Sequence, residues 1–246
     1  ILWFGWYGFN PGSTLSGMDF EGIGRVAANT TLAACAAGLT SVFWVYPRSK
    51  KWDMGISING FLGGLVAITA PCYWVKPGWA ILIGVIAGIL VPLVTDLLEH
   101  LRIDDPIGAV PVHLACGIWG CLSIGLFAGG FGIPGPEGAD NSVSIKGLFT
   151  GGGGTQLLAQ LVGVLACIIV VGIVGMIVMQ AIKRIPGEWG LRVSKDGELE
   201  GLDIHEHGVT AYHVEFGQGM SYTTPAGLSG GSKPPINLSD TEKVEA

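Results

Sequence analysis

Long apolar runs alternate with short polar stretches over most of the chain, and a polar tail begins at residue 183. Five runs of about 20 residues follow one another: Gly24–Tyr46, Ile56–Val75, Trp79–Leu98, Ile107–Gly130 and Leu157–Ile182. A helix rises ~1.5 Å per residue, so about 20 apolar residues cross a bilayer core ~30 Å thick. The pattern predicts an all-α integral membrane protein whose crossings are joined by short loops.

A shorter apolar run, ILWFGWYGFNPGS, precedes the five long ones. As a helix up to Phe9 it would reach only about 13 Å, which is too short for the bilayer core. Five of its first nine residues are aromatic, which is too apolar a composition for a loop. We interpret the run as the end of a further crossing helix that begins upstream of residue 1.

The basic residues fall unevenly on the two sides of the expected bundle. One side carries Arg48, Lys50, Lys51, Arg102, Lys183, Arg184, Arg192 and Lys195. The other side carries Arg25, Lys76 and Lys146. Because Lys and Arg concentrate in cytoplasmic loops of membrane proteins, this bias predicts a cytoplasmic tail and places residues 10–22 outside.

Composition supports the membrane class. Charged residues make up 13% of the chain, against about 25% in soluble domains, and the mean hydropathy is +0.54. The net charge of −6 lies mostly in the last quarter and points to no nucleic-acid partner. The five cysteines lie in or beside apolar runs, at spacings that fit neither a zinc site nor a disulfide framework. We expect them to be small buried hydrophobes, with no metal site and no cofactor.

Glycines recur at near-helical spacing inside the apolar runs. They are Gly60, Gly63, Gly64, Gly84, Gly88, Gly117, Gly120, Gly125 and Gly129. In lipid, small residues let helix backbones approach closely, so this spacing predicts a compact bundle. The run Gly151–Gly154 is not expected to bind phosphate, because no Lys-Ser/Thr follows it and no strand precedes it. We expect it to form an extracellular loop.

His113 stands out because the crossings contain almost no other ionisable residue. Asp105 and Pro106 are ordinary residues for a helix start, where acidic groups meet the positive end of the dipole. A helix opening there would carry His113 about 12 Å further, near the bilayer midplane. Its neighbours on that face are small: Ala109, Cys116, Gly117 and Gly120. An ionisable residue at this depth indicates a transport pathway or a proton relay.

Phe9 and Ser13 lie four residues apart at the outer end of the opening run. If the helix continues past Pro11, the two side chains stack one above the other. A small cation over an aromatic ring gains about 0.5–2 kcal/mol. A hydroxyl oxygen above the ring would add a directed hydrogen-bond acceptor, which a bare alkali ion cannot use. The alternative is that the aromatic residues only form an interfacial belt.

Four motifs carry a resemblance to a known family: WFGWYGFNPGS, NGFLGGLVAITAPC, IDDPIGAVPVHLACGIWGCLSIGLFA and GLDIHEHGVTAY. They resemble the ammonium transporter (Amt/Mep/Rh) family, and the first and last of them favour its Amt branch. The resemblance implies a homotrimer with eleven helices and one pore in each subunit. This chain would correspond to the second half of a subunit, starting inside the sixth helix and holding the seventh to eleventh.

The resemblance also implies roles for single residues. Phe9 matches the inner aromatic residue of the family's phenylalanine gate, and Ser13 matches the hydroxyl of its outer recruitment site. His113 matches the second of two pore histidines, and Leu2 a pore-lining apolar residue. Asp105 matches the aspartate that opens a helix. The first pore histidine, the second gate phenylalanine and the recruitment-site tryptophan would all lie upstream of residue 1.

The implied activity is transport of ammonium or ammonia across a cell membrane. Ammonium would bind at the outer site and lose a proton, and neutral ammonia would pass the gate and the histidine. Two alternatives are a Rh-type ammonia/carbon dioxide channel and an ammonium sensor that signals to a partner. An enzyme is not expected, because only Cys116, Cys121 and Ser123 lie near His113 as possible reacting groups.

The tail is expected to have two parts. Residues 183–216 form a charged cytoplasmic segment, and residues 217–246, rich in Gly, Ser, Pro and Thr, are expected to be disordered. In the resembling family the first part packs under the pore and regulates transport. Gly201 and Gly208 would let strand-like pieces fold back. His205 stands where plant relatives carry a phosphorylated threonine, so a P-II type signal protein remains a possible partner. A metal site at His205-Glu206-His207 is not expected without further ligands.

Overall fold

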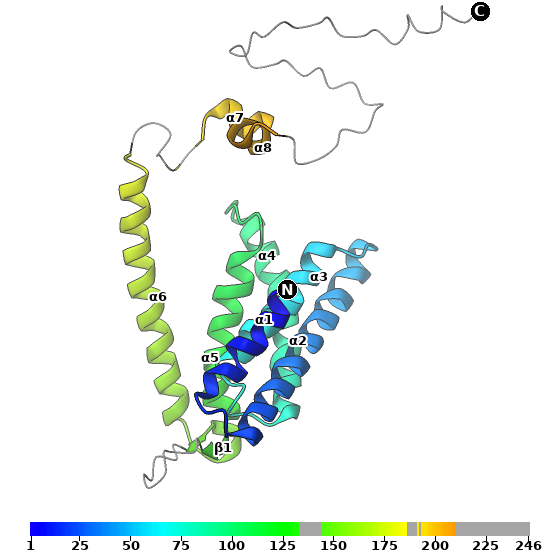
Figure 1. Cartoon of the computed structure of the whole chain (residues 1–246), viewed down its shortest axis with the longest axis vertical. Helices are drawn as coiled ribbons and strands as arrows, with labels where there is room; N and C mark the ends of the chain where they lie inside the picture. The colour runs from blue at the N-terminus through cyan, green and yellow to red at the C-terminus, as the bar shows by residue number, and fades with distance from the viewer. Residues whose placement is uncertain (133–143, 186–190, 192, 210–246) are drawn as a thin grey trace, which may run out of the picture. The chain divides into compact units, whose positions relative to one another are not determined.

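The computed structural model describes residues 1–132, 144–185, 191 and 193–209, and the chain divides into two compact units, Ile1–Met179 and Gln180–Ala246. The first unit is mostly helical (Figure 1). Its principal helices are α1 (Leu2–Phe9), α2 (Phe20–Ser49), α3 (Met54–Thr69), α4 (Pro77–His100), α5 (Cys116–Phe127) and α6 (Thr155–Ile182), whose last residues belong to the second unit. A 3-10 helix, η1 (Pro11–Thr14), follows α1, and a π-helix, η2 (Val110–Ala115), runs directly into α5.

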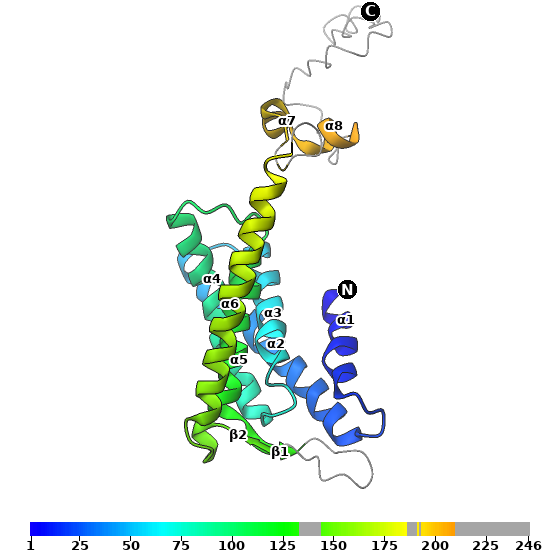
Figure 2. The same ribbon diagram turned by 90° about the vertical axis from the view of Figure 1, so that its left-hand side faces the viewer.

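The core of the first unit is the contact between α2, α3 and α4, which lie side by side in both views (Figure 2). A Cβ atom added at Gly64 of α3 would lie 2.5 Å from the Ala33 carbonyl oxygen of α2. Added at Gly88 of α4, it would meet the backbone of Ala37. Backbones therefore touch where the glycines lie, and the predicted compact bundle is confirmed.

Among the described residues, four helical stretches are long and apolar enough to cross a membrane: Phe20–Ser49, Pro77–His100, Val110–Phe127 and Thr155–Ile182. They coincide with four of the five predicted crossings, although α2 begins and ends some residues beyond the apolar run. Asp19 caps the start of α2 by accepting the Gly22 N–H at 2.9 Å. At its other end the Lys50 N–H bonds to the Tyr46 carbonyl at 2.8 Å, with Lys50 in the left-handed conformation. The polar caps thus set the helix ends.

The predicted crossing Ile56–Val75 is shorter than expected, because α3 stops at Thr69 after 16 residues. Pro71 lacks the N–H that would continue the helix, and the chain turns from there to Val75. The buried Asn29 of α2 donates from Nδ2 to the Cys72 and Val75 carbonyls, both at 2.8 Å. Non-helical backbone inside a membrane protein needs such partners, and Asn29 supplies them.

The crossing predicted to start at Ile107 also begins later. Gly108 adopts a positive φ of 72°, and residues 105–109 form a turn before η2 starts at Val110. Within η2 the Cys116 N–H reaches back to the Pro111 carbonyl, which is the wider π-helical pattern. The helical rise from Asp105 to His113, on which the predicted depth of His113 rested, is therefore absent.

The connection from α5 to α6 is longer than the short loop expected. It contains an antiparallel pair of strands, β1 (Gly129–Gly132) and β2 (Ser144–Lys146), and a 3-10 turn, η3 (Leu148–Thr150). Gly129 pairs with Lys146, and Gly132 with Ser144. Residues 151–154 then link η3 to α6, as a loop with positive φ at Gly151 and Gly153.

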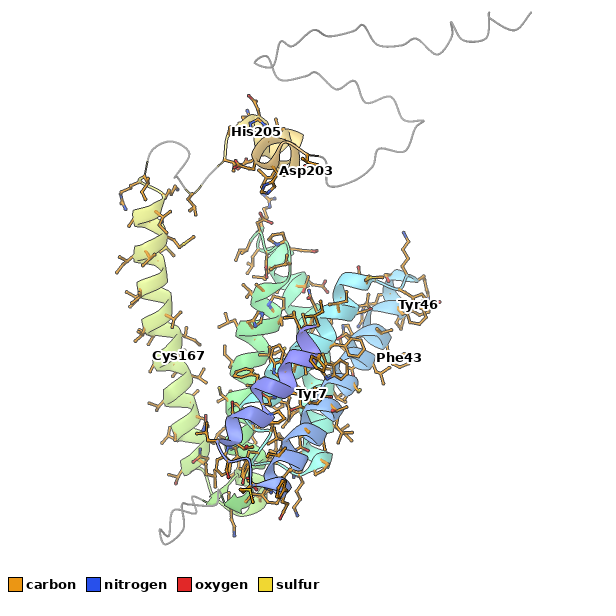
Figure 3. All side chains as sticks on the ribbon, viewed as in Figure 1. Tyr7, Phe43, Tyr46, Cys167, Asp203 and His205 are labelled. Atoms are coloured by element: carbon orange, nitrogen blue, oxygen red, sulfur yellow. The ribbon has the colours of Figure 1, made fainter. Side chains whose placement is uncertain are left out.

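All five cysteines are free, but the expectation that they are buried holds fully only for Cys72 and Cys116. Cys35 and Cys121 are half-buried, and Cys167 is exposed on α6 (Figure 3). The reason is that α6 has no buried residue along its length. Its side chains are predominantly apolar, so this helix is suited to a lipid or protein environment rather than water.

The second unit contains two short helices, α7 (Lys195–Glu200) and α8 (Leu202–His207). They replace the strand-like pieces expected here, and Gly201 joins them with a φ of 105°. Ser194 caps α7 by accepting the Gly197 N–H at 3.0 Å. The predicted disordered part, residues 217–246, lies outside the described residues, as do residues 210–216.

Candidate functional site

Three side-chain hydrogen bonds attach α1 to the core. Trp6 Nε1 donates to Thr69 Oγ1 at 2.8 Å, and the hydroxyls of Tyr7 and Thr31 lie 2.7 Å apart. Asn10, which is only 3% exposed, donates from Nδ2 to Thr30 Oγ1 at 3.0 Å. The bonds reach both α2 and the end of α3. They therefore fix the position of Phe9, which lies between the attached residues.

Ser13 lies one helical turn after Phe9, and its side chain contacts the Phe9 backbone. Asn10 keeps a helical conformation, η1 continues from Pro11, and Ser13 Oγ donates to the Phe9 carbonyl at 2.6 Å. Since this bond uses the hydroxyl proton, the Ser13 oxygen retains lone pairs that accept from another donor. Both residues are exposed, Phe9 by 56%, so a small cation can reach the ring and the oxygen.

His113 lies in η2 and is exposed. Three residues later, Cys116 Sγ lies 3.9 Å from the carbonyl oxygen of Ala87, near the middle of α4. His113 is thus about one turn from the midpoint of a membrane-length helix. The His113 side chain makes no hydrogen bond to any residue in the described ranges, so its ring is free for a ligand.

Two of the small neighbours of His113 pack closely against other helices. Cys116 is buried, and a Cβ at Gly120 would lie 2.5 Å from the Ala67 carbonyl oxygen of α3. Their small size serves the packing of η2 and α5 against α3 and α4. Gly117 is the exception, because the nearest side-chain atom to an added Cβ is 3.9 Å away, on Val66.

Asp105 lies before η2, and its carboxylate accepts the N–H groups of Ala109 and Val110, both at 2.8 Å. Both oxygens are therefore used in starting the helix that carries His113. Gly108 needs its positive φ for this turn, and an added Cβ would meet the Asn59 side-chain nitrogen at 2.5 Å. Leu2 lies on α1 and is 63% exposed. The structure shows no contact that joins Leu2 or Phe9 to His113 within the described residues.

The residues singled out in the tail lie around α7 and α8. His205 Nε2 lies 3.0 Å from Ser194 Oγ, so it connects the end of α8 to the start of α7. Gly201 and Gly208 both have positive φ, of 105° and 67°, and supply the turns at either end of α8.

Sequence reasoning missed Asn10, Asn29 and Thr30, because attention went to ionisable residues and these three are neutral. Yet each is buried, and each holds backbone or α1 in place. Polar residues inside an otherwise apolar run were the available signal, since a buried amide must find hydrogen-bond partners. Asn29 Oδ1 is buried with no partner among the described residues.

A sequence model of the Ammonium Transporter Family matches residues 1–212, which is most of the chain. The chain belongs to this family. The match includes the four motifs quoted above and confirms the resemblance that they carry. It also includes the described part of the tail, so the family relationship extends beyond the last membrane-length helix.

Two named relatives are similar over the same region. Ammonium transporter Amt2 of Archaeoglobus fulgidus is 40% identical over 213 residues, which cover 86% of this chain and 44% of the relative. Ammonium transporter 1 member 1 of Solanum lycopersicum is 37% identical, covering 87% of this chain and 46% of the relative. The chain thus spans less than half the length of these ammonium transporters.

Solved structures of the family share this fold. A protein named Sensor Amt Protein matches with a TM-score of 0.69 at 34% identity, covering 83% of this chain and 46% of that one. Mep2 of Saccharomyces cerevisiae matches with a TM-score of 0.70 at 31% identity, covering 79% and 42%. The chain therefore has the fold of part of an ammonium transporter, in a multi-pass membrane protein.

Proposed function

We propose that the full-length protein carries ammonium or ammonia across a cell membrane. The observation that carries this proposal is the position of Ser13 one turn after Phe9, with its hydroxyl on the Phe9 carbonyl, in a chain of this family. The relatives are named as transporters, and we propose no catalytic activity for this protein.

Ammonium binding at this pair follows from the geometry. The Ser13 oxygen accepts an N–H of the ion, while its own O–H continues to donate to the Phe9 carbonyl oxygen. The Phe9 ring below attracts the charge by a cation–π interaction of about 0.5–2 kcal/mol. Potassium has no N–H to direct, so the acceptor favours ammonium.

Passage as neutral ammonia follows from the free-energy cost of placing a charge inside the bilayer. A charge at the centre of the bilayer costs at least ~2.5–3.5 kcal/mol, so loss of the proton before the apolar stretch lowers the barrier. We place Leu2 on the apolar wall and His113 further along the pathway, where its free ring exchanges hydrogen bonds with ammonia or relays the proton. Asp105 acts indirectly, by starting the helix that carries His113.

The outer site is tested by comparing Ser13→Ala with Phe9→Ala in the full-length protein. We expect Ser13→Ala to raise the ammonium concentration for half-maximal uptake by about tenfold or more, because one hydrogen bond to a charged group, worth about 1.5–3 kcal/mol, is lost. Phe9→Ala should change the maximal rate as well, since it removes the ring that closes the path. Uptake in proteoliposomes over a range of ammonium concentrations separates the two effects.

The control is Ser57→Ala, whose hydroxyl bonds to the Asp53 carbonyl at the opposite end of the bundle. Ser57→Ala should leave both the ammonium concentration for half-maximal uptake and the maximal rate unchanged. If Ser13→Ala and the wild type gave the same concentration dependence, Ser13 would have no part in recruitment.

A sensor is the second candidate, and it is favoured by the similarity to a protein named Sensor Amt Protein. The same outer site would then report ammonium to a partner instead of passing it. Ammonium uptake in proteoliposomes distinguishes the two, because a transporter needs no partner for uptake whereas a sensor binds the ion with little flux.

We further propose a homotrimer with a cytoplasmic tail that regulates all three subunits, by way of Gly201, His205 and Gly208. A P-II type signal protein is the proposed partner. Because a histidine stands where phosphate control would need a hydroxyl, binding of a protein is the better mechanism for this chain.

The proposed regulatory role of the tail is tested by truncating the chain. Ending the chain at Gly190 removes α7 and α8, and we expect uptake to fall about threefold or more. Ending it at Gly217 keeps both helices and should change uptake little. Uptake is compared at matched amounts of protein in the membrane. Equal activity of the Gly190 truncation and the full chain would remove the regulatory role.

A further inference from the structure

The turn between α2 and α3 combines basic and aromatic side chains at the end of a membrane-length helix. Arg48, Lys50 and Lys51 fall within four positions, and all three are exposed. Within the described part of the chain, no carboxylate forms an ion pair with them. The nearest carboxylate in sequence, Asp53, accepts the Ile56 N–H at 2.8 Å and so starts α3. The turn therefore presents positive charge that the described chain does not neutralise.

Aromatic side chains lie directly beside these charges. Tyr46 and Trp52 stack with ring centroids 4.2 Å apart, and Trp52 is 66% exposed. Phe43 lies on the same helix end as Tyr46 (Figure 3). It is also 66% exposed. Large apolar rings this exposed indicate an apolar neighbour. Aromatic rings next to Lys and Arg are typical of the membrane–water interface.

The backbone of the turn is fixed, so the charges keep their positions. Lys50 closes α2 in the left-handed conformation, with its N–H on the Tyr46 carbonyl. The Lys51 N–H donates to Ser49 Oγ at 3.2 Å. The Arg48 side chain packs against its own helix, with its guanidinium 4.3 Å from the centre of the Trp44 ring. Lys50 and Lys51 are left as the two basic side chains available to a ligand.

We propose that this turn binds the headgroup of an anionic phospholipid. Lys50 and Lys51 contact the phosphate, and the Tyr46–Trp52 stack and Phe43 contact the glycerol and the first methylenes of the acyl chains. A lipid fits better than a soluble anion, because it satisfies the exposed rings and the charges together. It also fits better than an acidic protein segment, because the turn ends a bilayer-crossing helix, where headgroups are always present. The proposal does not depend on which solute the protein carries.

The test uses phosphatidylglycerol brominated on its acyl chains, which quenches nearby tryptophan fluorescence. The full-length protein in detergent is titrated with this lipid, and the Trp52 signal is the difference between the wild type and Trp52→Phe. We expect quenching of Trp52 at a lower concentration of phosphatidylglycerol than of brominated phosphatidylcholine. A basic residue near a membrane surface contributes about fivefold in affinity, so Lys50→Gln with Lys51→Gln should weaken phosphatidylglycerol binding about 25-fold.

The matched control is Lys76→Gln, which removes a lysine at the opposite end of the bundle, at the start of α4. It should leave the Trp52 titration unchanged. Soluble glycerophosphate should not displace the lipid, since it has no chains to cover the rings. The proposal is overturned if the two lipids quench equally, or if the double variant titrates like the wild type. It is also overturned if Trp52 becomes accessible to lipid only after residues 183–246 are removed, because the tail would then be the occupant.

Discussion

Gly64→Ala should destabilise the membrane-spanning bundle by about 1–3 kcal/mol, the usual cost of overpacking a close contact. The added Cβ would lie 2.5 Å from the Ala33 carbonyl oxygen and 2.9 Å from the Ala34 Cα, both backbone atoms of α2. Backbone cannot rotate out of the way as a flexible side chain can, so α2 and α3 must move apart. Thermal unfolding of the purified protein in detergent measures the loss.

The expected loss of stability has the opposite sign to the usual effect of a Gly→Ala substitution. In a helix interior, Gly→Ala normally stabilises by about 1 kcal/mol, because alanine has the higher helix propensity. Gly172→Ala on α6 is the control, since an added Cβ there has no atom within 4 Å. It should leave stability unchanged or raise it. If Gly64→Ala unfolded at the same temperature as Gly172→Ala, the close approach of α2 and α3 would be wrong.

His113→Ala should lower ammonium uptake about tenfold or reduce its selectivity over potassium, without unfolding the protein. The ring is exposed and makes no hydrogen bond to a described residue, so its removal opens no cavity in the core. Loss of one hydrogen bond to a passing ligand, worth about 0.5–1.5 kcal/mol, corresponds to up to about tenfold in rate. Uptake in proteoliposomes with and without competing potassium measures both quantities.

His113→Gln separates two roles of the imidazole. Glutamine exchanges hydrogen bonds but does not titrate. If His113 only binds ammonia, His113→Gln should keep most of the uptake, and if His113 relays a proton, uptake should fall as in His113→Ala. Unchanged melting temperatures of both variants serve as the folding control. Wild-type uptake and selectivity in His113→Ala would exclude His113 from the pathway.

The crossings could be read from the sequence because hydropathy is a local property of the chain. Lipid requires a continuous apolar run for each span, so α2, α4, α5 with η2, and α6 appear where the runs lie. The pairing of Phe9 with Ser13 is local in the same way, since four residues of helix bring them together. The glycines of α3 and α4 indicated close helix contacts by their spacing.

Where those runs stop being helical was decided by residues far away in the chain. α3 ends early because Pro71 has no N–H to continue the hydrogen-bond ladder. The carbonyls of Cys72 and Val75 instead accept hydrogen bonds from Asn29, which lies 43 residues before Cys72 in the chain. Likewise, the turn at Gly108 and the π-helix after it replace a straight helix from Asp105. No window of hydropathy contains both partners of such a bond, so a local pattern cannot reveal it.

The candidate site shows the same division. Its residue types, Phe9, Ser13 and His113, could be named from the sequence and from the family's motifs. What holds Phe9 in place, however, is the attachment of α1 by Tyr7 to Thr31 and by Asn10 to Thr30. The sequence by itself thus determined which segments are apolar enough to cross a membrane and which side chains are candidates for the chemistry. Only the tertiary structure decided how those segments are held, because a buried polar group is satisfied by whichever partner the fold brings within about 3 Å.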